Sequence, residues 1–193
     1  EVFEKNFGLF DAEEFILISK EGYLFPDTYF FLPNVNAKDV ADRMENNFWE
    51  QVSKLKEDID NSEYSFDEIL TMASIIEEEA NTPESRRIIS GILWNRIEIG
   101  MALQVDATFA YVNGKNTYTL SREDLADESP YNTYINKGLP PGPISNPGID
   151  SIIAALEPAE TEYLYFLHDL KGNVYYAEDF EGHQVNRERY LRR

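Results

Sequence analysis

Hydrophobic residues recur at helical spacing in the first third of the chain. Val40, Met44, Phe48 and Val52 follow one another at intervals of four, and charged residues stand between them. This spacing places the apolar side chains on one face of an α-helix. The pattern therefore predicts a helix over residues 36–56 that packs against a core.

The next predicted helix begins with a capping box and ends in three consecutive carboxylates. Ser65 is followed three residues later by Glu68, which is the capping-box pattern. At about 100° per residue, Glu78 points away from the apolar face of this helix, and Glu77 and Glu79 lie on its two margins. The predicted apolar face is formed by Ile69, Leu70, Met72, Ala73 and Ile76.

The acidic end of this helix has two interpretations. Charged residues at a helix end are most often simply solvated. Alternatively, a carboxyl group held at the edge of a core has a raised pKa and can act as a general acid near neutral pH. The helical angle argues against Glu78 in this second role and leaves Glu77 and Glu79 open.

A further helix is predicted over residues 82–99, with Pro83 at its first helical position. Only a short connection separates it from the preceding helix, so the two are expected to be neighbours. Arg86, Arg87 and Arg96 are the clustered basic residues near the three glutamates, and we expect them to form salt bridges.

Strand patterns are confined to two parts of the chain. Residues 162–167 and 174–177 predict two strands joined by a turn. The aromatic-rich residues 21–33 predict a loop or edge segment that leads into a short strand, because Pro26 excludes a central strand. The aromatic rings there either pack in the core or line a sugar cleft. Shorter helices are expected over residues 11–20, over residues 148–156 and after Asp179.

Residues 101–150 form a long connection, and its proline- and glycine-rich part is expected to lack regular structure. Their proline- and glycine-rich run at residues 138–148 sets φ at several positions and leaves carbonyl groups free to accept hydrogen bonds. A connection of this length inside a compact domain is usually functional. Together, these elements predict an α+β fold: a mostly helical domain with a small antiparallel sheet and a long Pro/Gly-rich loop region.

The amino-acid composition excludes several classes of function. The chain has 193 residues, 42% of them hydrophobic, which is enough for one domain with a real core. Its 36 acidic and 17 basic residues give a net charge of −19, which argues against nucleic acid and anionic lipid surfaces as partners. The absence of cysteine excludes disulfides and thiolate chemistry. His168 and His183 have no metal-site spacing, so we predict no metal and no cofactor.

With these types of chemistry excluded, general acid–base catalysis by carboxyl groups remains, as in the cleavage of glycosidic bonds. With these residues laid out, the sequence resembles the endolytic murein transglycosylase family, also described as YceG-like. The matching segments follow the family's order between residues 21 and 185. They are residues 21–29 and 70–79, Asn95-Arg96, residues 99–101, Leu103-Gln104 with Asp106 and Thr108, Tyr131-Asn132-Thr133-Tyr134, residues 138–144, Asn146-Pro147-Gly148 and residues 163–166.

The resemblance implies an enzyme that cuts peptidoglycan strands internally, between N-acetylmuramic acid (MurNAc) and N-acetylglucosamine (GlcNAc). The product would end in 1,6-anhydro-MurNAc. One alternative is a muramidase-type hydrolase, which needs a second carboxylate facing the acid, with Asp106 as the best candidate. Another is a non-catalytic module that binds glycan or serves as a scaffold for cell-wall synthesis proteins.

The resemblance also assigns residues. It implies that Glu77 is the catalytic acid and leaves a supporting role for Glu79 open. Five further residues are expected either to contact substrate or to orient Glu77, although structural hydrogen bonds would explain them equally well. These residues are Gln104, Asp106, Tyr131, Asn132 and Thr133.

Family members carry an N-terminal membrane anchor and a small LysM-like region. Residues 1–20 are therefore expected to be the end of that region or a linker helix, and residues 21–193 the catalytic domain. The chain begins with Glu1, so we expect a fragment that lacks the anchor. The expected location is the cell envelope, at the extracytoplasmic face of the cytoplasmic membrane. The expected partners are peptidoglycan strands and cell-wall synthesis proteins.

Overall fold

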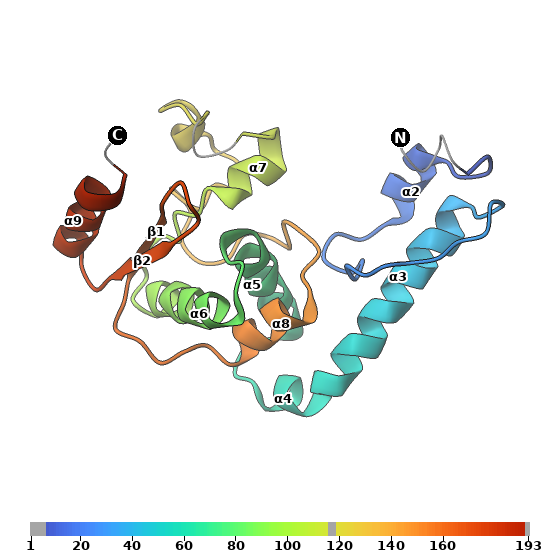
Figure 1. Ribbon diagram of the computed structural model, residues 1–193, viewed down its shortest axis with the longest axis horizontal. Coiled ribbons are helices and arrows are strands. Elements are labelled where there is room, and N and C mark those ends of the chain that lie inside the picture. Colours follow the sequence, from blue (N-terminus) through green and yellow to red (C-terminus); the bar gives the residue numbers. More distant parts are fainter. Residues whose placement is uncertain (1–6, 116–118, 192–193) are drawn as a thin grey trace.

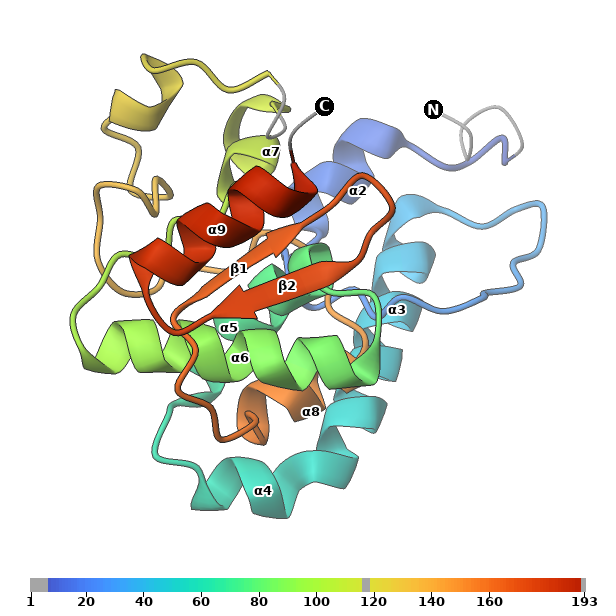
Figure 2. The same cartoon turned by 60° about the vertical axis from the view of Figure 1, so that its left-hand side comes forward.

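The protein is described by a computed structural model over residues 7–115 and 119–191. It has the predicted α+β architecture, with helix α5 (Phe66–Glu79) in the middle of the molecule (Figure 1). Helices α6 (Pro83–Glu98) and α8 (Ile149–Leu156) pack against α5, and α3 (Ala37–Val52) lies on its other side (Figures 1 and 2). The remaining helices are α2 (Ala12–Ile18), α4 (Lys56–Asn61), α7 (Ala107–Asn113), α9 (Phe180–Tyr190) and the 3₁₀ helices η1 (Ser53–Leu55) and η2 (Asp124–Ala126).

Helix α5 is the core of the fold. Its predicted capping box is present, because the Ser65 hydroxyl accepts from the Glu68 N–H and the Glu68 carboxylate accepts from the Ser65 N–H. The predicted apolar face is buried, but so are Thr71, Ser74 and Ile75 on the remaining sides. Neighbouring elements cover α5 all round, and a helix in that position cannot keep a polar face.

The Pro/Gly-rich loop braces α5 instead of presenting free carbonyl groups to the cavity described below. The N–H of Ile144 donates to the Ser74 hydroxyl at 3.0 Å. The side-chain oxygen of Asn146 accepts from the N–H groups of Gly22 and Leu24. Gly22 has φ of +89°, and a Cβ there would lie 2.6 Å from a ring carbon of Pro143. Two motifs far apart in the sequence therefore form one structural contact.

The predicted strand after Pro26 is wrong. Within residues 21–33 the described chain has no strand. The Phe25 carbonyl accepts a local hydrogen bond from the Tyr29 hydroxyl at 2.7 Å. Tyr23 and Phe25 are buried in the core, whereas Phe30 is 95% exposed. None of these rings lines the cavity described below, so core packing explains the buried ones.

The long connection over residues 101–150 contains two short helices that the sequence did not predict, α7 and η2. Helix α7 has seven residues, fewer than the window of about 11–18 residues over which helical periodicity is recognised in a sequence. It is held by tertiary contacts, with Thr108 and Phe109 buried. Tertiary packing therefore decided its conformation.

The predicted hairpin is confirmed. Strands β1 (Tyr165–His168) and β2 (Val174–Ala177) pair antiparallel, with Tyr165 opposite Ala177 and His168 opposite Val174. Helix α9 packs along this hairpin (Figure 2). The Asp179 side chain caps α9 by accepting from the Gly182 N–H at 2.8 Å. No helix among the described residues is both long and apolar enough to span a bilayer.

Replacing Gly91 by alanine tests the packing of α6. A Cβ at this position would lie 2.2 Å from the carbonyl oxygen of Ala159. Alanine normally favours a helix over glycine by about 1 kcal/mol, but the clash involves a backbone atom and should dominate. We expect Gly91→Ala to reduce the free energy of unfolding by about 1–3 kcal/mol in a denaturant titration. Gly142→Ala is the control, because its nearest atom, the Tyr131 hydroxyl, lies at 3.6 Å. Equal stability of both variants would contradict the close approach.

Candidate active site

A cavity of about 940 Å³ opens where the C-terminal end of α5 meets the start of α7, the hairpin and α9. This volume lies at the upper end of the range of about 300–1,000 Å³ that is typical of ligand pockets. Its walls come from segments that are far apart in the sequence. The principal polar and aromatic lining residues are Glu79, Arg96, Gln104, Asp106, Tyr134, Tyr165, Phe166, His168, Phe180, His183 and Arg187.

Glu79 is the last residue of α5 and reaches into this cavity, where it is only partly exposed. Burial raises the pKa of its carboxyl to about 7, and the negative charge of Asp106 adds to this effect. A hydrogen bond from the Ala107 N–H acts in the opposite direction. No cation among the described residues forms an ion pair with Glu79. Its carboxyl group can therefore hold a proton near neutral pH.

Asp106 lies at the start of α7 and accepts a 2.5 Å hydrogen bond from the Tyr134 hydroxyl. Burial and this bond raise the pKa of Tyr134, so the phenol stays protonated and remains a donor. Two side chains 28 residues apart are thereby oriented next to Glu79.

Gln104 lines the same cavity with a backbone φ of 52°, in the left-handed region. It is the one non-glycine residue of the described chain with positive φ. Such conformations are unfavourable and cluster at functional sites. The Gln104 N–H donates to the Thr133 carbonyl at 3.0 Å, which holds the backbone in place while the side chain stays exposed.

Three of the predicted substrate contacts lie outside this cavity. Asn132 is 1% and Thr133 2% exposed, and both bind backbone groups: Asn132 donates to the Asp127 carbonyl at 2.7 Å, and Thr133 accepts from the Val105 N–H at 3.1 Å. Tyr131 packs against the ring of Tyr111. Both residues therefore fit the structural alternative: Thr133 holds the chain that carries Gln104 and Asp106, and Asn132 holds the loop that contains Leu125 and Asp127.

Glu77 does not line the cavity. One of its carboxylate oxygens accepts from Arg86 at 3.2 Å, and the other accepts from the Gly148 N–H at 3.1 Å and the Ser151 hydroxyl at 2.7 Å. Its side chain is 26% exposed. Glu77 thus joins α5 to α6 and to the start of α8, and both of its carboxylate oxygens accept from protein donors.

The expectation of salt bridges holds for two of the three arginines. Arg86 pairs with Glu77 and also with Asp150 at 3.6 Å, and Arg87 pairs with Glu157 at 3.6 Å. Arg96 does not form an ion pair with any described residue. It is buried and donates to the carbonyls of three residues, namely Leu164, Ala102 and Leu103. The prediction for Arg96 was wrong because backbone carbonyls, not carboxylates, surround it.

The aromatic lining of the cavity was not predicted. It comes from Tyr165 and Phe166 of β1 and from Phe180 of α9. His168 also lines the cavity, and burial lowers its pKa, so its imidazole is neutral at pH 7. The one sequence signal for this lining was the high aromatic content of the predicted strand. Which of its rings face the cavity depends on where α9 packs, and the sequence pattern does not show that.

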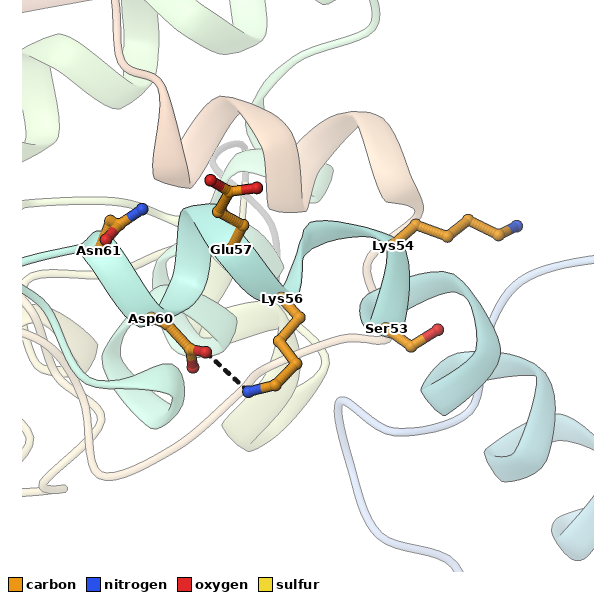
Figure 3. Close-up of a pocket in the computed structure, with 6 residues that line it drawn as sticks. All are labelled: Ser53, Lys54, Lys56, Glu57, Asp60 and Asn61. Atoms are coloured by element: carbon orange, nitrogen blue, oxygen red, sulfur yellow. Dashed lines mark hydrogen bonds and ion pairs between the residues drawn. The ribbon is translucent and has the colours of Figure 1, made fainter.

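No group of three or more His, Cys, Asp or Glu side chains among the described residues is arranged to hold a metal ion. A second hollow, of about 540 Å³, lies along η1 and α4 (Figure 3). Its lining is entirely polar, and Lys56 and Asp60 there pair with each other at 2.7 Å. It contains no aromatic surface and no strained residue, so we do not regard it as the candidate site.

The fold and the cavity define a class of protein: an α+β domain with a protonatable carboxyl at the end of a buried helix, in a cavity suited to a polar, ring-containing ligand. Comparison with known proteins makes this class specific. The model of the YceG-like family matches residues 2–189, and the chain belongs to this family.

Individual proteins that the chain resembles support this family assignment. The chain is 41% identical over 172 residues to the endolytic murein transglycosylase of Bacillus subtilis (strain 168), covering 89% of this chain and 48% of that protein. It is 36% identical over 172 residues to the endolytic murein transglycosylase of Streptococcus pneumoniae serotype 2, and the match covers 86% of this chain and 31% of that protein. A crystal structure of a YceG-like protein from Listeria monocytogenes matches with a TM-score of 0.80 at 37% identity, covering 95% of this chain and 62% of that one. The chain thus spans about half or less of the curated relatives' length.

Proposed function

We propose that this chain is the catalytic part of an endolytic peptidoglycan lytic transglycosylase, which cleaves MurNAc–GlcNAc bonds within glycan strands. The observation that carries the proposal is the environment of Glu79. This carboxyl lies in a cavity large enough for sugar rings, and its pKa is about 7. The names of the relatives support the same reaction class.

The reaction needs one group that first gives and then takes a proton. Protonated Glu79 donates its proton to the glycosidic oxygen as the bond from that oxygen to C1 of MurNAc breaks. The GlcNAc hydroxyl leaves, and positive charge develops at C1. The Glu79 carboxylate then removes the proton from the MurNAc 6-hydroxyl, whose oxygen bonds to C1. The 1,6-anhydro ring closes, Glu79 is protonated again, and no water is consumed.

The other polar lining residues have positions suited to supporting roles. Gln104 presents an amide from a constrained backbone, and Tyr134 holds Asp106 beside Glu79. We assign Gln104 and Asp106 to contact with the sugar hydroxyl or N-acetyl groups. Tyr131, Asn132 and Thr133 would act indirectly, through the backbone that they hold.

The choice of acid differs from the one that the resemblance implied. Glu77 stays a prediction that no comparison tests, but its protein partners leave it outside the cavity. Glu79 has the position, the pKa and the access that a general acid requires. We therefore propose Glu79 as the acid and Glu77 as a structural residue.

One observation favours a second candidate function. Asp106 lies close enough to Glu79 for its charge to raise the Glu79 pKa. A carboxylate pair flanking the scissile bond is what a muramidase-type hydrolase uses, with the second carboxylate acting as a base or a nucleophile. In that case water would be consumed, and the product would have a reducing MurNAc end.

Mass spectrometry of digested glycan strands separates these candidates. We expect products with 1,6-anhydro-MurNAc ends, and we expect Asp106→Asn to retain this product type, because ring closure needs no second carboxylate. Reducing MurNAc ends that disappear in Asp106→Asn would instead establish the hydrolase. A folded chain that binds strands without cutting them would favour the scaffold alternative.

The setting of the reaction follows from its substrate. We propose that the chain acts in the cell envelope, at the extracytoplasmic face of the cytoplasmic membrane, on peptidoglycan strands. An anchor outside residues 1–193 would supply the membrane attachment, and residues 21–193 would form the catalytic domain. Proteins of cell-wall synthesis are the proposed protein partners.

A further inference from the structure

One face of α9 contributes to the cavity that holds Glu79. Four lining residues of this segment, Phe180, His183, Arg187 and Leu191, follow one another at intervals of three or four. Residues with this spacing lie on one side of a helix. The face therefore belongs to the cavity wall as a unit, and nothing in the proposed reaction uses it.

Arg187 is the distinctive member of this face. Its side chain is exposed and forms no ion pair with any described residue, although the chain carries 36 acidic residues and a net charge of −19. Arg86 and Arg87, by contrast, both pair with carboxylates. The positive charges of Arg187 and Arg96 add to the effect of burial in lowering the pKa of His183. Arg187 therefore lies beside this ring and supplies to the cavity a positive charge that no described residue pairs with.

Flat apolar surface lies next to this charge. Phe180 is 52% exposed although it lines the cavity. The Tyr165 ring stacks on His183 with a centroid distance of 5.3 Å and lies 6.0 Å from the Phe180 ring. A large aromatic side chain left open inside a cavity is suited to the apolar face of a sugar ring.

Resting on the proposed function, we infer that the α9 face is a subsite for the carboxylate-bearing muramic acid residue, with Arg187 binding the carboxylate and Phe180 contacting the sugar ring. A guanidinium group matches a carboxylate in geometry as well as charge. In an alternating strand GlcNAc is neutral. MurNAc carries a lactyl carboxylate, either free or joined to a stem peptide with carboxylates of its own. A cation at this position would therefore distinguish the two sugars.

The test compares Arg187→Gln with Arg189→Gln. Arg189 is on the same helix but does not line the cavity, and its guanidinium lies near the Tyr190 ring. Three substrates are needed: stem-free strands with free lactyl carboxylates, strands that carry stem peptides, and both kinds after conversion of the carboxylates to neutral amides. We expect Arg187→Gln to raise KM about tenfold on carboxylate-bearing strands, with little change in kcat, and to have no effect on amidated strands. Arg189→Gln should match the unsubstituted chain throughout.

The outcomes are distinguishable. An effect on stem-free strands alone would identify the lactyl carboxylate as the ligand, and an effect on stem-bearing strands alone would identify the peptide; either supports the subsite. Equal KM for the two variants, or an equal loss on amidated strands, overturns it. Failure of the unsubstituted chain to cleave any strand would overturn the proposed function instead. Binding of the same strands, measured by calorimetry with each variant, would then still decide whether the subsite exists.

Discussion

A Glu79→Gln variant is expected to lose about 10²- to 10⁴-fold in kcat for strand cleavage. Glutamine has nearly the same shape but has no acidic proton to donate to the glycosidic oxygen and cannot remove one from the 6-hydroxyl. Both steps of the proposed reaction therefore fail together. The measurement is the rate of release of 1,6-anhydro-terminated fragments at saturating strand concentration, with the fold checked by circular dichroism.

Glu77→Gln is the matched comparison, because it makes the same chemical change two residues earlier on the same helix. It removes the charge that pairs with Arg86 while keeping an oxygen for the Ser151 hydroxyl. We expect this variant to retain most of its kcat and to lose about 1–3 kcal/mol of unfolding free energy. The reverse result, with Glu77→Gln folded but inactive and Glu79→Gln active, would restore the assignment that the resemblance implied.

The pH dependence of cleavage should follow the ionisation of Glu79. The active form is the protonated acid, and the pKa of this carboxyl is about 7. We expect kcat/KM to fall by about tenfold per pH unit above that value. In Asp106→Asn the falling limb should shift to lower pH, because the neighbouring negative charge that raises the Glu79 pKa is removed. An unshifted limb would show that Asp106 does not act on this group.

The same pKa predicts a change in stability that does not depend on activity. The folded state keeps the proton on Glu79 to higher pH than the unfolded chain, where the pKa is near 4.5. This contribution to stability is complete below the unfolded pKa and is lost as the pH rises through about 7. Relative to Glu79→Gln, the unsubstituted chain should therefore lose up to about 3 kcal/mol of unfolding free energy between those pH values. Parallel stability curves for the two proteins would show that the pKa is not raised.

Most of the helix boundaries could be read from the sequence, because capping and periodicity are local effects. Ser65 with Glu68, Asn36 and Pro83 each begin a helix as predicted, and the turn before Val174 returns the chain as a hairpin. Helix α7 could not be predicted, because it is short and is held by burial of Thr108 and Phe109. The strand predicted after Pro26 failed because no partner strand lies beside it among the described residues.

The sequence by itself determined that three carboxylates end an apolar helix, that Glu78 points away from the apolar face of this helix, and that Glu77 and Glu79 lie on the two margins of that face. Only the tertiary structure distinguished those two margins. Arg86 and Ser151, from α6 and α8, donate hydrogen bonds to the Glu77 carboxylate, which does not line the cavity. Burial in the cavity raises the pKa of Glu79, and the like charge of Asp106, at the start of α7, adds to this effect. The pKa of a carboxyl depends on what other segments bring to it, and helical periodicity contains no information about those segments.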